Sequence, residues 1–190
     1  MVDAMGTPCH TGRATISGIR FVIFLTIGSH EPFDRLVQAV DEWRDHTAHT
    51  HEIVAQVVSP ASGAYMPRNF KMTPHLSPRE YEARILEANL IVSHAGMGSI
   101  LTAFTHGKPI VIMPRRGHLR ETRNDHQYTT IKNLRPRPGL FIAEDEAEFA
   151  NVIESALAVN SDDGQPRLSP VADEKFIDAI RSFILSSESR

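Results

Sequence analysis

The sequence predicts an α/β domain with a doubly wound parallel sheet. Continuous apolar runs alternate along the chain with segments whose apolar residues recur at helical spacing. Strands buried on both faces have continuous apolar sequences, and their alternation with helices is typical of a parallel sheet covered on both sides. Two of the runs end in glycine-bearing turns that lead into helical patterns. In such a sheet both turns lie at the carboxyl ends of strands, where ligands bind.

The first strand, turn and helix are predicted from residue 21. Residues 21–27 are apolar or β-branched, which predicts a central strand, and Gly28-Ser29-His30 follows them. Pro32 suits a first helical turn. The apolar positions of the following helix recur at i, i+3, i+4, i+7 and i+10, and are Phe33, Leu36, Val37, Val40 and Trp43.

The next segment contributes a strand, a loop and a capped helix. Residues 53–58 predict a strand, and the Pro-, Gly- and Ser-rich residues 59–68 predict a surface loop. Ser77 and Glu80 form a capping box with Pro78 at the first helical position. The apolar positions of that helix are Tyr81, Ile85, Leu86 and Ala88. Three histidines precede the strand at residues 53–58, and they are His46, His49 and His51. They belong either to a metal site with a further ligand or to a solvated loop.

The second glycine turn is the main candidate site. The apolar run at residues 90–92 is followed by the turn at residues 94–99, and apolar residues at helical spacing continue after Gly98. Gly96 and Gly98 permit positive φ and a close approach of the backbone to a ligand. The first N–H groups of a helix have no internal partner and, with the helix dipole, favour an anion. The turn is therefore predicted to bind phosphate, and Ser99 either caps the helix or donates its hydroxyl to a phosphate oxygen.

Taken alone, this turn also fits a tight strand-to-helix connection. It lacks the third glycine of the dinucleotide fingerprint and the Gly-Lys-Ser/Thr of a P-loop. His94 either fills the end of the strand or contacts the ligand. The side chains of Met97 and Phe104 are expected in the core.

The loop after the strand at residues 109–113 contains four arginines: Arg115, Arg116, Arg120 and Arg123. In one account the loop is solvated and its arginines pair with Glu121 and Asp125. In the other account the guanidinium groups recognise a phosphate or a carboxylate, for which their bidentate geometry is suited.

The remaining pattern sets the domain organisation. Residues 140–142 predict a short strand, and acidic residues 144–146 stand where a helix N-terminus favours them. We expect a disordered leader at 1–19, one ligand-binding domain at 20–159, a linker at 160–170 and a C-terminal helix at 171–190. The apolar positions of that last helix are Phe176, Ile177, Ile180, Phe183 and Ile184.

Composition limits the classes of function. The chain has 190 residues, of which 41% are hydrophobic, and this suits a single domain. The formal net charge of −3 gives no global basic field, so we expect no nucleic-acid partner. The single Cys9 excludes an internal disulfide and favours a reducing cytosolic setting. No apolar run approaches the roughly 20 residues of a membrane span.

Four motifs, in this order, resemble glycosyltransferase family 28, C-terminal domain. They are residues 26–36, residues 93–101, Gly107-Lys108-Pro109 and residues 124–127. The resemblance covers most of the chain, from about residue 20 to residue 157. The chain looks most like the small catalytic subunits of bacterial two-subunit exopolysaccharide transferases, relatives of the catalytic subunit of the dolichol-diphosphate N-acetylglucosamine transferase and of MurG-type enzymes.

The resemblance implies a Rossmann-like domain that is one half of a GT-B glycosyltransferase and holds a UDP-sugar donor. The implied partner is a membrane-anchored subunit that binds a lipid-diphosphate-linked sugar acceptor, which would place the chain in the cytoplasm, at the inner face of the membrane. The implied reaction is inverting transfer of a hexosyl or glucuronosyl group in exopolysaccharide or capsule biosynthesis. No Asp-x-Asp motif occurs, and the resemblance implies a reaction without metal or cofactor.

The resemblance also implies a donor site between the two glycine turns, with main-chain amides gripping the diphosphate. Its residues are Gly28, Ser29, His94, Gly96, Met97, Gly98, Ser99, Thr102, Arg115, His126 and Gln127. Thr102 stands where many relatives have a glutamate that binds the ribose, so ribose recognition stays open. His30 and Glu31 are candidates for the general base. Alternatively, Glu31 caps the helix that begins near Pro32, and the base lies on the partner.

Two alternatives remain at this point. The chain is either an enzyme subunit or a non-catalytic nucleotide-sugar-binding or scaffold module of a polysaccharide assembly complex. Among donor sugars, glucuronate, galactose and N-acetylglucosamine are all compatible with the sequence, and the arginine-rich loop favours an acidic sugar.

Overall fold

A parallel sheet forms the centre of the molecule. The computed structural model describes residues 20–28, 31–58, 64–134, 136–159 and 167–169, together with Glu174 and Asp178. Within these residues the sheet has six strands in the order β3-β2-β1-β4-β5-β6, and every neighbouring pair is parallel. The strands are β1 (Val22–Thr26), β2 (Glu52–Gln56), β3 (Met72–Thr73), β4 (Leu90–His94), β5 (Ile110–Met113) and β6 (Leu140–Ile142). The helices are α1 (Asp34–His46), α2 (Pro78–Glu87), α3 (Met97–Thr105), α4 (His126–Asn133) and α5 (Glu146–Ala158), with a 3-10 turn η1 (Gly117–Leu119).

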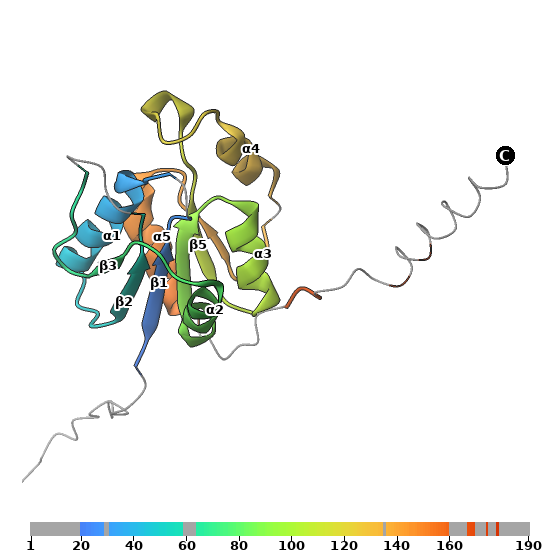
Figure 1. Cartoon of the computed structure of the whole chain (residues 1–190), viewed down its shortest axis with the longest axis horizontal. Helices are drawn as coiled ribbons and strands as arrows, with labels where there is room; N and C mark the ends of the chain where they lie inside the picture. The colour runs from blue at the N-terminus through green and yellow to red at the C-terminus, as the bar shows by residue number, and fades with distance from the viewer. Residues whose placement is uncertain are drawn as a thin grey trace, which may run out of the picture.

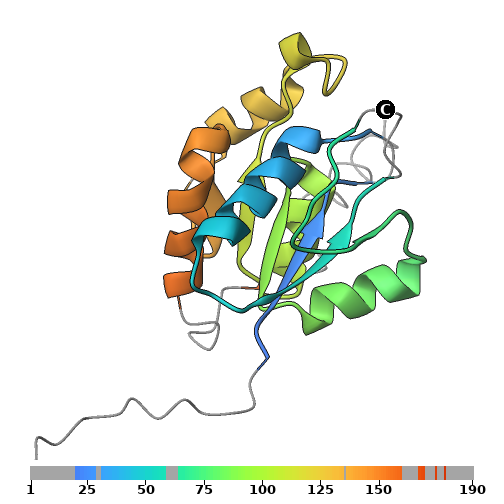
Figure 2. The ribbon, with the colours of Figure 1, turned by 90° about the vertical axis from the view of Figure 1, so that its left-hand side faces the viewer.

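Helices cover both faces of the sheet (Figures 1 and 2). α1 and α5 lie together on one face, and α2 and α3 lie on the other. Side chains of β1 alternate between the two cores, because successive residues of a strand point to opposite faces. Ile23 and Leu25 are fully buried under α1 and α5, whereas Phe24 is fully buried on the opposite side. The predicted central strand and doubly wound sheet are confirmed.

The strand order creates a switch point between β1 and β4. The chain runs outward from β1 to β2 and β3, and then returns to place β4 beside β1, where Thr26 is in register with Ser93. At such a point the connections after the two strands leave towards opposite faces, which opens a crevice at the carboxyl ends. The two glycine turns therefore share one rim of the sheet, as the sequence predicts.

Both ends of α2 are held by specific hydrogen bonds. The predicted capping box is present, because Ser77 Oγ accepts a hydrogen bond from the Glu80 amide at 3.3 Å and the Ser77 amide donates to Glu80 Oε2 at 2.8 Å. At the other end, Lys108 Nζ donates to the carbonyls of Leu86 at 2.6 Å and Ala88 at 2.7 Å. Lys108 of the Gly-Lys-Pro motif thus satisfies the carbonyls that end the helix.

The start of α1 differs from the prediction. Phe33 is its N-cap and Asp34 its first residue, so Pro32 precedes the helix rather than forming its first turn. No side chain caps α1, so the interpretation of Glu31 as its cap is wrong. The five apolar positions predicted for this helix are nevertheless all buried in the core under α1 and α5.

Three further details of the prediction are corrected. β3 was not expected, because two residues are too few to show a periodic pattern. Leu86 is 55% exposed instead of facing the core, and Met97 is 47% exposed, whereas Phe104 is buried as predicted.

Several predicted features lie outside the described residues. They are the leader at 1–19, Ser29 and His30 of the first turn, residues 160–166 and 170 of the linker, and all but Glu174 and Asp178 of the C-terminal segment. In the part of the chain that is described, no helix combines the length and the apolar character that a membrane span needs.

Candidate functional site

A cavity of about 500 Å³ opens at the switch point, beside the carboxyl ends of β1 and β4. Thr26 and Gly28 reach it from the end of β1, and Gly98, Ser99 and Thr102 reach it from the first turns of α3. The other side is formed by the end of β2 and by the residues around the start of α2, which are Gln56, His75, Leu76, Pro78 and Tyr81. The cavity therefore combines one glycine turn with the N-terminus of a helix.

The N-terminus of α3 suits an anion. Gly96 is its N-cap and no side chain caps the helix, so its first N–H groups are left for another acceptor. A Cβ added to Gly98 would meet no atom within 4 Å, so the backbone here is open to a ligand. Neither glycine uses the positive φ that its residue type permits, because Gly96 has φ −90° and Gly98 is helical. Of the two uses considered for Ser99, capping is excluded, because no side chain caps α3.

The ring of His94 lies between the two glycine turns. A Cβ on Gly28 would stand 3.2 Å from His94 Cε1, and a Cβ on Gly96 would overlap His94 Nε2. Both glycines are thus required by the close approach of this ring, and Gly28 also has φ +82°. The expectation that the space between Gly28 and Gly96 is open for the diphosphate is wrong. The open volume lies beside it, between α3 and α2.

His94 is neutral at physiological pH. Burial of the imidazole, with smaller electrostatic contributions from Arg115 and His126, lowers its pKa from the ordinary 6.5 to about 4. Its Nδ1 lies 3.3 Å from Ser93 Oγ, within hydrogen-bonding reach. His94 can therefore exchange hydrogen bonds with a ligand but does not bring a positive charge to it.

A chain of polar groups supports the floor of the cavity. Thr26 Oγ1 donates to Gln56 Oε1 at 2.8 Å, and Gln56 Nε2 donates to the carbonyl of Gly28 at 3.2 Å. Burial raises the pKa of the Tyr81 hydroxyl, and hydrogen bonds with Thr26 and Ser99 partly offset that rise. Gln56 was not predicted from the sequence, and Tyr81 was predicted among the apolar positions of its helix. A polar residue at the end of a strand next to β1 is the signal that would have found Gln56.

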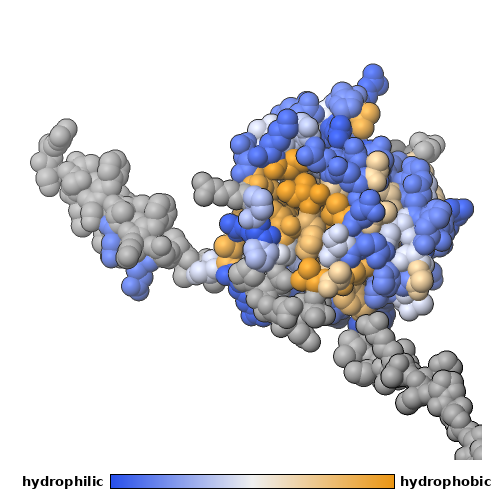
Figure 3. All heavy atoms as spheres, turned by 180° about the vertical axis from the view of Figure 1, so that it is seen from behind, coloured by the Kyte–Doolittle hydropathy of each residue, from blue (hydrophilic) through white to orange (hydrophobic). Residues whose placement is uncertain are grey.

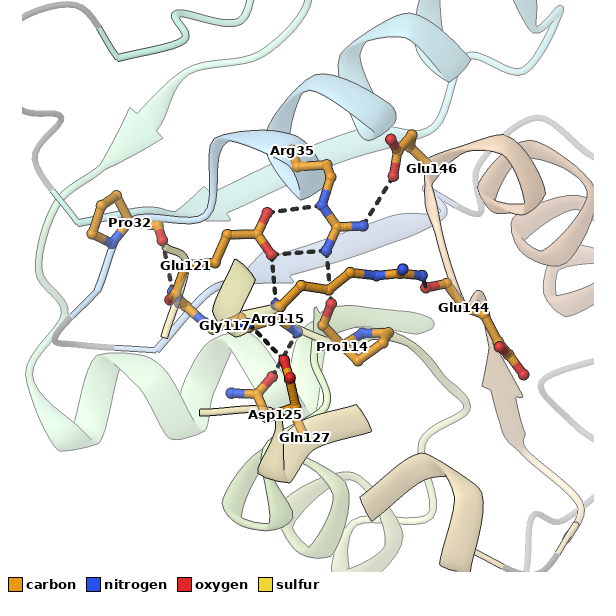
Figure 4. Close-up of polar contacts among 11 residues, drawn as sticks. Pro32, Arg35, Pro114, Arg115, Gly117, Glu121, Asp125, Gln127, Glu144 and Glu146 are labelled. Carbon is orange, nitrogen blue, oxygen red and sulfur yellow. Dashed lines mark hydrogen bonds and ion pairs between the residues drawn. The ribbon is translucent and has the colours of Figure 1, made fainter. Parts of the chain in front are cut away.

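Arg115 is buried and bonded to main-chain carbonyls. Its side chain is 3% exposed. Its Nη2 donates to the carbonyls of Ile27 at 2.6 Å and Glu31 at 2.7 Å, and its Nη1 donates to those of Pro32 at 2.6 Å and Glu121 at 3.1 Å. Figure 4 shows the Pro32 contact. Arg115 thus holds the main chain on both sides of residues 29 and 30 and is turned away from solvent.

The predicted pairing of the loop arginines with Glu121 and Asp125 is wrong. Glu121 forms a bidentate pair with Arg35 of α1, with Nε to Oε1 and Nη2 to Oε2 both at 2.8 Å (Figure 4). Asp125 Oδ1 accepts the amide of Gly117 at 2.7 Å. Arg115 is buried, whereas Arg120 and Arg123 are exposed. The loop is thus fixed by its acids, while two of its arginines face solvent.

The remaining candidates lie around this loop. The Gln127 side chain is buried, and its Oε1 accepts the amide of Arg115 at 3.1 Å. His126 is exposed at the start of α4, and the Glu31 carboxylate is 44% exposed at 3.9 Å from Arg115 Nη1. The predicted residues that line the cavity are Gly28, Gly98, Ser99 and Thr102, and those outside its lining are Glu31, His94, Gly96, Met97, Arg115, His126 and Gln127.

The histidine cluster does not form a metal site, and a second cavity of the domain does not suit an anion. Among the described residues no group of three or more His, Cys, Asp and Glu side chains is placed to hold a metal ion. His49 instead stacks on His51 at 4.7 Å and contacts Glu154 Oε2 at 3.1 Å. A second cavity, of about 460 Å³, lies between α1 and α5, and its carboxylates disfavour an anion.

The parallel sheet with its cavity at the switch point is a Rossmann-like domain with the fold of one half of a GT-B glycosyltransferase. Residues 22–168 match the profile of the glycosyltransferase family 28 C-terminal domain. Because this match spans most of the chain, the chain belongs to that family. No curated protein sequence matches it.

Solved structures of glycosyltransferases share the fold. The glycotransferase of kitacinnamycin is 16% identical with a TM-score of 0.53, and the match covers 83% of this chain and 40% of that one. VinC, solved in complex with dTDP, is 17% identical with a TM-score of 0.50, over 87% of this chain and 42% of VinC. ALG13 is 16% identical with a TM-score of 0.45, over 85% of this chain and 94% of ALG13. The chain spans 40% of the length of the first of these structures.

Proposed function

We propose that the chain is the donor-binding half of a UDP-sugar glycosyltransferase. The observation that carries this proposal is the cavity at the switch point, where the uncapped N-terminus of α3 and the open backbone at Gly98 favour a diphosphate. Membership of family 28 supports a nucleotide-sugar donor. VinC, which shares the fold, was solved with a nucleoside diphosphate.

The chemistry requires stabilisation of the leaving diphosphate. As the bond from the sugar to UDP breaks, negative charge grows on the β-phosphate, and fixed N–H donors stabilise it best. The amides at the start of α3 supply such donors, and the buried charge of Arg115 adds a positive field without direct contact. In this proposal no metal or other cofactor takes part.

The acceptor hydroxyl must lose a proton as it attacks the anomeric carbon, with net inversion. Glu31 is the described candidate for the base, because its carboxylate is partly exposed on the same rim. His30, which lies outside the described residues, is the other candidate on this chain. Alternatively, the base belongs to a partner.

The acceptor is the part of the proposal that needs a second protein. We propose a membrane-anchored subunit that presents a lipid-diphosphate-linked saccharide at the inner face of the membrane, in exopolysaccharide or capsule biosynthesis. The transferred group is hexosyl or glucuronosyl. Figure 3 shows an apolar area bordered by hydrophilic side chains on the face seen from behind, and such areas are typical of interaction surfaces.

The donor proposal is tested by calorimetric titration of the folded chain with UDP. We expect binding that weakens more than tenfold in Gly98→Leu, because the longer side chain enters the cavity. Gly98→Ala is the matched control and keeps binding within about threefold, since a Cβ meets no neighbour there. Absence of UDP binding in the folded wild type, or equal binding by Gly98→Leu, contradicts the proposal.

A non-catalytic nucleotide-sugar-binding or scaffold module is the second candidate. It is favoured by one observation, that the described lining of the cavity includes no carboxylate. A donor screen with the reconstituted partner and lipid acceptor separates the two. An enzyme consumes one UDP-sugar in that assay and loses turnover in Gly98→Leu, whereas a binding module consumes none.

A further inference from the structure

The loop between β5 and α4 forms a projecting tip, residues 116–125, whose shape is fixed by hydrogen bonds. It projects from the carboxyl rim of the sheet, at the top of Figures 1 and 2. The amide of Leu119 donates to the carbonyl of Arg116 at 3.2 Å, and the amide of Arg120 donates to the carbonyl of Gly117 at 2.9 Å. Asp125 Oδ1 closes the loop by accepting the Gly117 amide at 2.7 Å. The tip is therefore a built structure instead of a loose connection.

The backbone at the tip is held in a strained conformation. Arg120 has φ +59° and ψ +24°, and in the described part of the chain it is the one residue other than glycine with positive φ. A side chain in this region is strained, and such strain is typical of functional segments. The consequence is a tight turn that displays the side chains on either side of it.

The tip displays one leucine among cations. Leu119 is 48% exposed, and its neighbours His118 and Arg120 are exposed, as is Arg123 a few residues on. Of the two acids in this loop, Glu121 is paired with Arg35 and its side chain is 12% exposed, whereas Asp125 is exposed and accepts the Gly117 amide. This end of the molecule is hydrophilic in Figure 3 apart from a small apolar area.

We propose that this tip contacts the surface of an anionic lipid bilayer. Leu119 enters the interface between headgroups and acyl chains, while Arg120 and Arg123 pair with lipid phosphates. An apolar residue flanked by arginines binds such interfaces by burying apolar area and by attraction to anionic headgroups. The contact belongs to this chain itself and does not depend on the donor proposal.

Sedimentation with lipid vesicles tests the inference on the full chain. We expect the chain to bind vesicles of phosphatidylcholine with 30% phosphatidylglycerol at least fivefold more strongly than vesicles of pure phosphatidylcholine. Binding to the anionic vesicles should weaken at 0.5 M salt, because salt screens exposed charges. Leu119→Ser lowers the binding at least threefold. Leu86→Ser is the matched control, because Leu86 is similarly exposed, at 55%, but lies at the far end of α2, and it binds as the wild type does.

The outcomes separate a bilayer from other partners. Arg120→Gln combined with Arg123→Gln abolishes the preference for anionic vesicles if the proposal holds. Equal binding by wild type and Leu119→Ser overturns it and indicates attraction of charge alone. Absence of wild-type binding to anionic vesicles also overturns the proposal. The proposal is likewise overturned if Leu119→Ser loses binding to a protein partner while its binding to vesicles is unchanged. UDP titration of Leu119→Ser is measured in parallel, so failure of one proposal is distinguished from failure of the other.

Discussion

His94 shows how one residue accounts for two glycines. Its ring occupies the place that side chains at positions 28 and 96 would need, so the glycines of both turns serve the packing of an imidazole as much as access for a ligand. Burial next to Arg115 keeps that imidazole neutral. The residue therefore couples the stability of the rim to pH.

We expect His94 to make stability pH-dependent. Its pKa of about 4 in the folded state lies below the ordinary 6.5, so between these values the unfolded chain binds more protons. The stabilisation is fully present above about pH 6.5 and is lost as the pH falls towards 4, with a decrease in the free energy of unfolding of about 3 kcal/mol. Urea unfolding at pH 7.5 and pH 4.5 measures it.

His94→Gln removes the titrating group, so its stability falls less between these two pH values than that of the wild type. His118→Gln is the control, because His118 is exposed, and it keeps the wild-type pH dependence. A pKa above 6 for His94 by NMR titration contradicts the prediction.

At the scale of elements, Arg115 joins the end of β5 to the turn between β1 and α1. The two segments are far apart in the sequence, and four carbonyl groups converge on one guanidinium. The sequence suggested that this arginine reaches a ligand. A buried cation bonded to backbone oxygens instead supports the rim at which the ligand is proposed to bind.

Arg115→Met is expected to lower the free energy of unfolding by about 3 kcal/mol, because the carbonyls lose their donors in a buried place. Chemical denaturation followed by circular dichroism measures the change. Arg123→Met, at an exposed position of the same loop, should change stability by less than about 0.5 kcal/mol. Similar losses in the two variants would show that Arg115 has no special structural part.

For the whole molecule, the sheet sets a gradient of stability. β1, β4 and β5 lie inside the sheet and their side chains are almost all fully buried, whereas β3 is a two-residue edge strand with an exposed threonine. Backbone hydrogen bonds in a buried centre open only with much of the domain, and those at an edge open locally.

Hydrogen exchange should therefore be slowest in β1, β4 and β5. Amides of β3 should exchange at least about tenfold faster, because their opening needs little loss of buried contacts. Exchange measured by mass spectrometry on the full chain tests this order. Exchange in β4 as fast as in β3 would contradict the sheet order described here.

Much of the fold was predictable because its signals are local. Continuous apolar runs identified β1 and β4, the capping box identified the start of α2, and helical spacing identified the buried face of α1. β3 escaped because a two-residue strand has no period, and the N-cap of α1 escaped because Phe33 is an unusual cap. The motifs were enough to indicate the family that the profile match then showed.

The sequence by itself determined the order of the strands and helices other than β3 and α4, the carboxyl rim at which both glycine turns lie and the helix N-terminus that favours an anion. These follow from hydrophobic periodicity and backbone chemistry, which act over a few residues. Only the tertiary structure decided that His94 fills the space between the turns, that Glu121 pairs with Arg35 and that Arg115 points inward. Those outcomes depend on contacts between residues distant in the chain, and no local pattern specifies which partner a side chain meets.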